Sequence, residues 1–348
     1  MNKPQVILAL ALLIVPSLSW GEVFEEKRAE VEPAVERALS YLERQVRPDG
    51  TYPGGHGGST GIVSIVGMTF LSAGYTPNDP EYGKSVIACI DFVLDHHRED
   101  GLLDSGEGGN GPMYAHVIST LFLSEVSGMV GPDRQARIAE VLPSALQLIL
   151  DSQALMKEER YAGGWRYRPD SLDSDLSCSG WALMALRSSR LNGAPVPDRA
   201  FRAATQYITR NFSEENGRFG YQNKTSHHET LTGAGVLCLV LTGTPPDDPG
   251  LVRAGDSILK VARGGQLINQ SHALYGNYYN SQGMFQLGGK HWESYYQWMT
   301  QTYLPQQKDD GSWDSGLGEV YGTAMMTMAL TVPYRCLPIY QRDETVDK

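Results

Sequence analysis

The fold is decided by the stretch Gln307-Lys308-Asp309-Asp310-Gly311-Ser312-Trp313, a turn that recurs along the chain. Asp-Gly and Asn-Gly pairs form turns because glycine accepts a positive φ and the preceding side chain bonds to nearby backbone. The aromatic residue after the glycine is expected to fold back onto a helix end, where the glutamine amide can stack on its ring and bond to exposed backbone. The related turns are Asp49-Gly50-Thr51-Tyr52 (preceded by Gln45), Asp100-Gly101, Gly163-Gly164-Trp165 (preceded by Gln153) and Asn216-Gly217-Arg218-Phe219.

Two kinds of helical segment alternate around these turns. Segments of the first kind are amphipathic and should face solvent on one side, whereas those of the second kind are apolar nearly all round and should be buried. The amphipathic segments are 27–46, 82–97, 133–154, 198–211, 250–263 and 291–306, and the apolar segments are 60–74, 114–128, 178–191, 230–243, 274–287 and 321–336. The sequence therefore predicts six helix pairs of about 50 residues each and no sustained strand.

The six apolar segments have to be hidden from water together, because one helix pair cannot bury its apolar helix alone. A linear solenoid would end in a polar capping repeat, but the last apolar segment carries no charge from Thr323 to Leu330. Closing the pairs into a ring hides all six segments. We therefore predict an all-α protein, an (α/α)6 toroid of six helical hairpins, with a single domain over residues 22–348.

Composition limits the functions that can be expected. The chain has 348 residues, a net charge of −11 and no run of Lys or Arg, so we expect no nucleic-acid partner. Glycine is abundant, at 38 residues, but it has no Gly-X-Y period, which excludes collagen. The cysteines are widely spaced, so we expect buried free thiols in preference to disulfides or a CxxC metal site. They are Cys89, Cys178, Cys238 and Cys336.

The N-terminus has the pattern of a secretory signal peptide. Lys3 precedes an apolar run from Val6 to Val15, and small residues follow at Ser17 and Ser19. This run is too short to span a bilayer, which takes about 20 apolar residues. We expect residues 1–21 to be a signal peptide and the mature protein to be exported, periplasmic or extracellular, with no transmembrane anchor. A buried N-terminal helix is the alternative.

The turn Gln307-x3-Gly311-Ser312-Trp313 resembles the QW motif of the prenyltransferase and squalene-oxidase repeat superfamily, whose members are α/α toroids. The chain looks most similar to exported, single-toroid bacterial members of the planctomycete type. This resemblance covers about residues 35–340. It rests also on Met113-Tyr114-Ala115-His116, Gly163-Gly164-Trp165-Arg166-Tyr167, Asp173-Ser174-Asp175-Leu176-Ser177 with Gly180-Trp181, Gln286-Leu287-Gly288-Gly289 and Tyr334-Arg335-Cys336-Leu337-Pro338.

The resemblance implies candidate catalytic residues. In squalene–hopene-type cyclases a DxDD motif at the start of an inner helix protonates an alkene. Here Asp173-Ser174-Asp175-Leu176 keeps the first and third positions and has Leu in the fourth. By this resemblance Asp175 would be the acid, Asp173 would support it, and His116 is the third candidate. Alternatively, Asp173, Asp175 and Ser177 cap the helix that begins at about Cys178.

Protein prenyltransferases, which belong to the same superfamily, hold zinc with Asp, Cys and His. The corresponding candidates are Asp175, Cys178 and His228, but Cys178 is one residue out of register, which turns its side chain by about 100°. Catalytic zinc needs three protein ligands and an open position. We therefore expect no cofactor, with zinc as the alternative, and read His227 and His228 as ordinary loop histidines.

Aromatic residues gather where the apolar segments begin, and in a closed ring these starts converge at one end of the central cavity. Such cavities suit apolar or polyene ligands. We expect a small apolar or isoprenoid-like ligand, bound by the aromatic residues Tyr114, Trp165, Tyr167, Tyr278, Tyr279 and Tyr321, with Asp-dependent cyclase or transferase chemistry if the protein is an enzyme. Each ring could instead simply fill the barrel.

Two other functions stay open. One is a non-catalytic binding or scaffold toroid of the cell envelope. The other is a polysaccharide hydrolase or lyase, which would need a pair of carboxylates at a defined separation. No pair can be justified from the sequence alone. Besides Asp173 and Asp175, the candidates are Asp104, Glu107, Glu229, Asp314 and Glu319.

Overall fold

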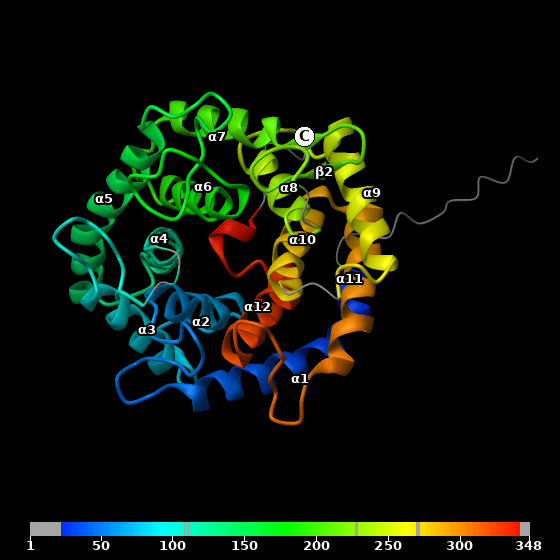
Figure 1. Ribbon diagram of the computed structural model, residues 1–348. Helices are drawn as coiled ribbons and strands as arrows, with labels where there is room; N and C mark the ends of the chain where they lie inside the picture. Colours follow the sequence, from blue (N-terminus) through cyan, green and yellow to red (C-terminus); the bar gives the residue numbers. More distant parts are fainter. Residues whose placement is uncertain (1–21, 108, 110, 227–228, 269–271, 342–348) are drawn as a thin grey trace, which may run out of the picture.

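The computed structural model describes residues 22–107, 109, 111–226, 229–268 and 272–341, and twelve α-helices make up most of this part of the chain (Figure 1). The expected signal peptide, residues 1–21, lies outside it. The outer helices are α1 (Glu22–Gln45), α3 (Gly83–Asp95), α5 (Pro132–Ala154), α7 (Asp198–Arg210), α9 (Pro249–Arg263) and α11 (Gly289–Tyr303). The inner helices are α2 (Thr60–Ser72), α4 (Met113–Val126), α6 (Leu176–Leu191), α8 (Thr232–Leu241), α10 (Ala273–Leu287) and α12 (Glu319–Thr331).

The inner helices form a closed ring. Each packs against the next in chain order, and α12 packs against α2, while the outer helices surround them (Figure 1). The inner helices are buried nearly all round, whereas outer helices such as α7 and α9 bury one face only. The predicted all-α (α/α)6 toroid is therefore confirmed. No helix in the described part of the chain combines the length and apolarity needed to cross a membrane.

The glycine turns are the joints between neighbouring repeats. Gly311 has φ 95°, and a Cβ added there would lie 2.2 Å from the carbonyl oxygen of Arg37 in α1. Only glycine allows both this conformation and this close approach. The Asp310 carboxylate accepts the backbone N–H of Ser312 at 3.0 Å. The same bond, to the residue two positions on, is made by Asp49, Asp100 and Asn216 in their turns.

The glutamine and tryptophan of this turn also do what the sequence predicts, since both bond to backbone. Gln307 Nε2 donates to the carbonyl oxygens of Gly311 at 3.0 Å and Ala34 at 2.8 Å. Trp313 Nε1 donates to the carbonyl oxygen of Tyr303 at 2.8 Å. Because Ala34 belongs to α1, the last turn of the chain closes the ring on the first helix. Gln153 makes the equivalent pair of bonds inside the ring, to Gly163 and Ala200.

Substituting Gln307→Ala should therefore weaken ring closure. The change leaves two partly buried carbonyl oxygens without their donor, and we expect the free energy of unfolding to fall by about 2 kcal/mol. Urea denaturation measures this loss. The matched control is Gln306→Ala, because exposed Gln306 bonds only within its own helical turn, to Thr302. An equal loss in both variants would contradict the closing role of Gln307.

The C-terminus differs from the prediction of one helix over 321–336. Helix α12 ends at Thr331 and passes into the 3₁₀ turn Val332–Tyr334, because Pro333 has no N–H for a helical bond. A second 3₁₀ turn, Pro338–Tyr340, then packs against α6. In Figure 1 this red segment lies in the middle of the ring.

Two smaller features complete the fold. The turn at Asn216-Gly217 joins two-residue strands, β1 (Phe212–Ser213) and β2 (Arg218–Phe219), so the expectation of no sustained strand holds for the described residues. All four cysteines are free. Cys89, Cys178 and Cys238 are buried and Cys336 is half-buried, as the sequence predicted for most of them.

Candidate functional site

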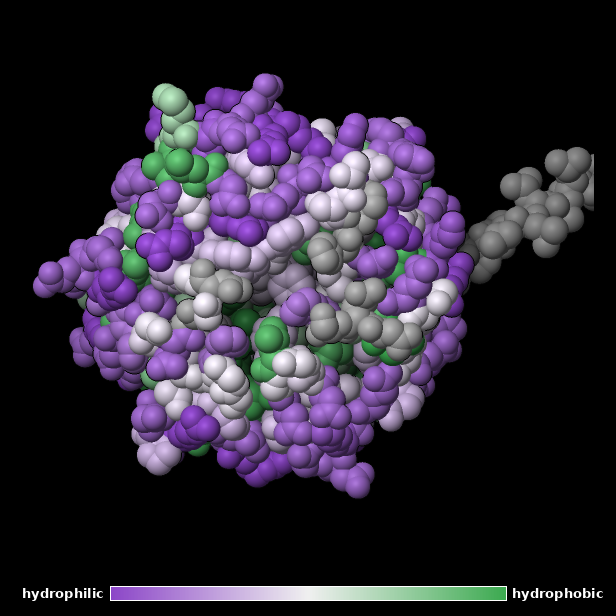
Figure 2. Space-filling view, in the orientation of Figure 1, coloured by the Kyte–Doolittle hydropathy of each residue, from purple (hydrophilic) through white to green (hydrophobic). Residues whose placement is uncertain are grey.

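A cavity of about 470 Å³ lies at the end of the ring where the inner helices begin. Its walls come from the first two turns of α2, α4 and α6, from the first turns of α10 and α12, and from the loops that precede the inner helices. Figure 2 shows the hollow in this face, with hydrophobic residues inside and hydrophilic residues around it. The lining residues are His56, Ser59, Gly61, Ile62, Ile65, Gly109, Gly111, Tyr114, Ala115, Ile118, Tyr167, Ser177, Trp181, Tyr221, Thr230, Leu231, His272, Tyr275, Leu317 and Tyr321.

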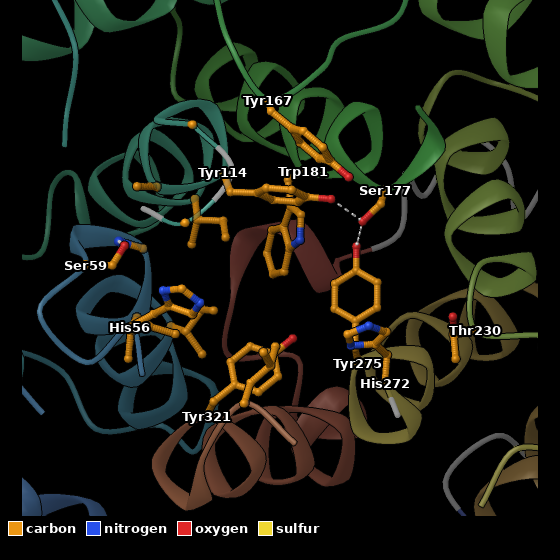
Figure 3. A pocket seen from close by; sticks show the side chains of 18 of the residues that line it. His56, Ser59, Tyr114, Tyr167, Ser177, Trp181, Thr230, His272, Tyr275 and Tyr321 are labelled. Carbon is orange, nitrogen blue, oxygen red and sulfur yellow. Dashed lines mark hydrogen bonds between the residues drawn. The ribbon is translucent and has the colours of Figure 1, made fainter. Parts of the chain in front are cut away.

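Three of the aromatic residues singled out from the sequence line this cavity, namely Tyr114, Tyr167 and Tyr321 (Figure 3). Sequence reasoning missed three aromatic lining residues, Trp181, Tyr221 and Tyr275. Trp181 lies four residues after Ser177, on the same face of α6, so helical spacing from the predicted helix start could have found it. Tyr275 lies in the first turn of α10, so its position at a predicted helix start could have identified it as well.

The other three predicted aromatic residues lie behind the wall. Trp165 is fully buried and donates from Nε1 to the carbonyl oxygen of Ile149 at 2.8 Å. Tyr278 stacks on Trp181, with ring centroids 5.4 Å apart and an interplanar angle of 17°, and Tyr279 meets Trp181 edge-on. These residues support the cavity wall and are not among the residues that line it.

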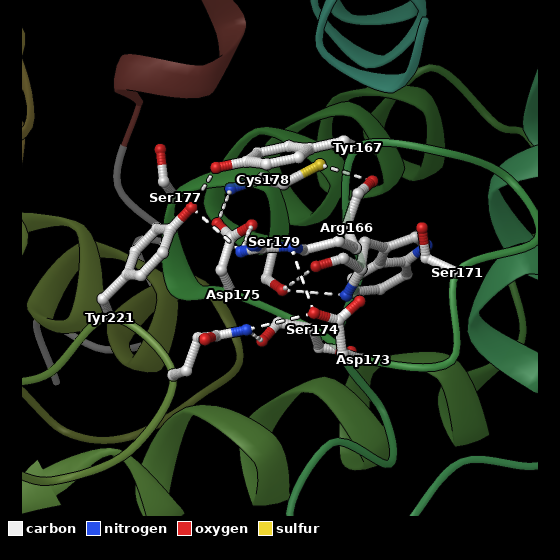
Figure 4. Close-up of polar contacts among 12 residues, drawn as sticks. Arg166, Tyr167, Ser171, Asp173, Ser174, Asp175, Ser177, Cys178, Ser179 and Tyr221 are labelled. Atoms are coloured by element: carbon white, nitrogen blue, oxygen red, sulfur yellow. Dashed lines mark hydrogen bonds and ion pairs between the residues drawn. The ribbon is translucent and has the colours of Figure 1, made fainter. Parts of the chain in front are cut away.

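Asp175 caps α6 and pairs with Arg166 beside the cavity (Figure 4). Its Oδ1 accepts the backbone N–H of Cys178 at 2.8 Å, and its Oδ2 lies 2.9 Å from the Arg166 guanidinium. The same guanidinium donates to the Tyr221 hydroxyl at 2.9 Å and stacks over the ring of Tyr167, 4.1 Å from the centroid. One ion pair, between half-buried Arg166 and fully buried Asp175, therefore holds two aromatic residues of the wall.

The surroundings of Asp175 do not suit an acid that delivers a proton into the cavity. The carboxyl is fully buried and is not among the lining residues. Burial raises its pKa to about 6, while the Cys178 N–H and Arg166 oppose the rise. Asp173 is more exposed and lies 3.3 Å from Arg166 Nε. For Asp175 the geometry shows the capping role that the sequence also allowed, whereas Asp173 bonds to Arg166 and Gln222 and does not cap the helix.

His116 is a structural residue in this fold. It is fully buried, and its Nδ1 accepts the backbone N–H of Leu103 at 3.1 Å. Its Nε2 donates to the carbonyl oxygen of Ala145 at 3.0 Å. Burial lowers its pKa to about 4, which keeps the ring neutral. With both nitrogens bonded to backbone, the imidazole has no proton to exchange with the cavity.

The zinc alternative finds no support among the residues that the structure describes, where no group of three His, Cys, Asp or Glu side chains could hold a metal ion. Cys178 is buried and its thiol donates to the carbonyl oxygen of Arg166 at 3.1 Å. Burial raises the pKa of this thiol well above its usual value, which disfavours the thiolate that zinc requires. His227 and His228 lie outside the described residues.

Acidic side chains are missing from the described wall of the cavity, and so are Lys and Arg. Asp314 and Glu319 both accept from Lys308 on the outside, and Glu229 pairs with Arg218. Asp104 and Glu107 lie before α4 and do not line the cavity either. The structure therefore does not bring the candidate carboxylates together there as a hydrolytic pair.

The C-terminal 3₁₀ turn, Pro338–Tyr340, closes the end of the ring opposite the cavity. Glu125 and Ser188 lie near the C-terminal ends of α4 and α6, and the backbone N–H of Ile339 donates to Glu125 Oε2 at 3.1 Å. Ile339 and Tyr340 are both buried. The cavity is therefore open at the end where the inner helices begin and blocked at the other.

No family model matches the sequence, and no curated protein does. Solved structures show the same fold at low sequence identity. The chain is similar to a variant of the type II terpene cyclase MstE from Scytonema, whose structure is a complex with geranylgeranyl dihydroxybenzoate. The TM-score is 0.58 and the sequence identity is 14%, and the match covers 90% of this chain and 99% of that one. It is also similar to an inactive variant of the α-1,6-mannanase GH76A of Salegentibacter sp. HEL1_6, in complex with α-1,6-mannotriose. Here the TM-score is 0.60 and the sequence identity 11%, with 90% of this chain and 98% of that one covered. A GH76 α-mannanase of Bacteroides thetaiotaomicron gives TM-score 0.60 and 10% identity over 90% and 99%. These likenesses support the toroid fold.

Proposed function

We propose that this protein is an exported member of the prenyltransferase and squalene-oxidase repeat group that binds an apolar, isoprenoid-like molecule in its central cavity. One observation carries the proposal: the described cavity wall consists of aromatic and aliphatic side chains with a few hydroxyls and two histidines, and it has no carboxylate. Its volume, about 470 Å³, is in the range of ordinary small-molecule sites. The terpene cyclase of similar fold holds a geranylgeranyl compound.

Binding without cyclisation is the reading that the geometry favours. A cyclase acid has to be protonated and to face the alkene. Asp175 is bonded to Cys178 and Arg166, is enclosed, and does not face the cavity. A glycosidase would need two acidic groups flanking a sugar, and the described wall offers neither. A mannanase-like activity is therefore the weaker alternative.

Binding can be tested by titrating the purified mature protein with geranylgeraniol and measuring the heat of binding. Ile62 lines the cavity and is partly exposed. Ile62→Glu should weaken binding about tenfold or more, because the apolar tail would have to desolvate a carboxylate. Leu191→Glu is the matched control, since Leu191 is 49% exposed at the far end of α6. Unchanged affinity in the Ile62 variant would place the ligand elsewhere.

Two further outcomes would replace this proposal. Conversion of a polyprenyl substrate that is lost in Asp175→Asn would establish cyclase chemistry. Release of soluble sugars from envelope polysaccharides would establish a hydrolase or lyase. Export is tested separately, by finding the protein in the extracytoplasmic fraction with Glu22 as its first residue.

A further inference from the structure

Three hydroxyl groups from three different inner helices meet at one point of the cavity wall. Tyr114 of α4 donates to Ser177 Oγ of α6 at 2.7 Å, and Ser177 Oγ is hydrogen-bonded to the hydroxyl of Tyr275 of α10. We call these residues the hydroxyl cluster. All three line the cavity, and Figure 3 shows their oxygens converging beside Trp181.

Counting hydrogens shows what this cluster offers to a ligand. Burial raises the pKa of Tyr114 and Tyr275 well above its usual value, so both phenols keep their protons. Three O–H groups share the two hydrogen bonds within the cluster. Whichever way the Ser177–Tyr275 bond runs, one O–H is left over. The Tyr279 hydroxyl lies next to that of Tyr275 behind the wall, so the spare hydrogen has two acceptors open to it, Tyr279 and a ligand atom in the cavity. A buried donor without an acceptor is costly, so a ligand that supplies one is favoured.

The charge around the cluster favours an uncharged ligand. No Lys or Arg is among the described lining residues, and the nearby Arg166 is already paired with Asp175 and Asp173. A diphosphate or a carboxylate would therefore enter without a lysine or arginine counter-ion and with one spare O–H donor, at a high desolvation cost. The positive ends of the inner helices favour an anion. Ser59 and Asp175 cap α2 and α6, whereas α4 and α10, which carry Tyr114 and Tyr275, have no side-chain cap. We expect these two helix ends alone not to repay the desolvation of an anion.

The apolar part of the wall lies next to the cluster. Ile62 and Ile65 of α2, Ile118 of α4 and Trp181 of α6 face the same cavity. Ile118 and Trp181 each lie four residues after a cluster member, Tyr114 and Ser177, so they are one helical turn further into the ring. A ligand with its polar atom at the cluster can therefore extend its apolar chain inward along this wall.

We propose that the cavity takes an uncharged isoprenoid with a single hydroxyl or carbonyl oxygen, and that this oxygen accepts the spare hydrogen of the hydroxyl cluster. This inference rests on the proposed function and specifies the class of ligand. It excludes prenyl diphosphates, and with them prenyl transfer from such donors.

A ligand series of one chain length tests the inference. The probes are geranylgeraniol, geranylgeranoic acid, geranylgeranyl diphosphate and the corresponding hydrocarbon without a head group, each delivered from cyclodextrin and measured by competition at pH 7. We expect the alcohol to bind about fivefold more tightly than the hydrocarbon, the effect of one net hydrogen bond. We expect the acid and the diphosphate to bind more weakly than the hydrocarbon.

The matching variant is Tyr114→Phe/Ser177→Ala/Tyr275→Phe. Removing one hydroxyl alone would still leave a spare O–H, whereas removing all three leaves only apolar atoms at this point of the wall. The Tyr279 hydroxyl, which bonds to Tyr275, stays behind the wall. Such joint replacement can be nearly neutral for stability, which urea denaturation verifies. The fivefold preference for the alcohol should vanish while the hydrocarbon still binds. The control is Ser189→Ala/Tyr303→Phe, which removes two buried hydroxyls that lie outside the cavity.

The outcomes separate the two proposals. If none of the four probes binds, the proposed function fails and the inference fails with it. If the alcohol and the hydrocarbon bind but an anion binds as tightly as the alcohol, or the triple variant keeps the alcohol preference, the inference alone is overturned.

Discussion

Replacing Arg166 by alanine is expected to destabilise the protein by about 3 kcal/mol at pH 7, within the range seen when one partner of a buried ion pair is removed. The change leaves the fully buried Asp175 carboxylate without its counter-ion, held by backbone N–H groups of the helix start, those of Cys178 and Ser177. It also removes the bond to the Tyr221 hydroxyl and the stacking over Tyr167. Removing one partner of a buried ion pair costs about 3–5 kcal/mol. We expect the lower value here because the Asp175 carboxyl can take up a proton and so avoid being charged without its counter-ion.

The pH dependence identifies the cause of this loss. Without Arg166 the pKa of Asp175 should rise further above the value of about 6 that burial already gives it. Below about pH 5 the carboxyl is protonated in both proteins, so the difference in unfolding free energy should shrink to what lost packing leaves. Urea denaturation at pH 5 and pH 7 measures both values.

Two further variants separate the effect of the unpaired Asp175 charge from that of lost packing. Arg166→Ala/Asp175→Asn should recover much of the loss and show no such pH dependence, because the asparagine can still cap α6 and carries no charge. Arg166→Lys should fall between the wild type and the alanine variant, since a lysine cannot bridge Asp175 and Tyr221 in one plane. A loss in Arg166→Ala that is equal at both pH values would show that packing, and not the orphaned charge, is responsible.

The fold was predictable from the sequence because its deciding signal is local and repeated. In four turns an Asp or Asn side chain bonds to the backbone two residues on. Gln307 bonds to backbone, as the recurrence of a glutamine before the glycine turns predicted, and the structure shows that one of its partners is Ala34 of the first helix. No glycine turn and no helical pattern follow Pro333, so the path of the C-terminal segment, with its 3₁₀ turn Pro338–Tyr340, into the ring could not be predicted.

The candidate site was predicted less completely, because the face of a helix start that points inward depends on packing between repeats. Tyr114 and Tyr321 line the cavity, whereas Tyr278, one helical turn beyond Tyr275, lies behind Trp181. His116 follows Tyr114 by two residues and so points to the outer helix, where it bonds to Ala145 of α5. Asp175 precedes a helix, and this position signals a cap as strongly as a catalytic acid.

The contact that holds the C-terminal segment contains a buried acid whose ionisation should control stability. Glu125 accepts the Ser188 hydroxyl and the backbone N–H of Ile339. Burial raises its pKa from 4.5 to about 7, and the two hydrogen bonds oppose the rise. The phenols of Tyr278 and Tyr340 are the titratable groups that face it. Tyr278 in turn stacks on Trp181, so the segment supports the cavity wall.

The sign of the pH effect follows from the raised pKa. Between pH 4.5 and 7 the unfolded chain has lost the Glu125 proton while the folded chain keeps it. The folded state then binds more protons, and its stability falls as the pH rises, by about 1.4 kcal/mol per unit. The full loss, about 3 kcal/mol, is reached above pH 7.

Glu125→Gln should remove this loss. The amide oxygen can accept the Ile339 N–H and the amide nitrogen can donate to Ser188, so both contacts survive without a charge. We expect the variant to match the wild type at pH 4.5 and to exceed its unfolding free energy by about 3 kcal/mol at pH 8. Comparing the two proteins at each pH cancels the titration of other groups, such as His116 and Asp175. A constant difference across this range would show that Glu125 is charged in the folded protein throughout. The C-terminal segment would then be held by a carboxylate, because an ionised acceptor binds the Ile339 N–H more strongly than a protonated one.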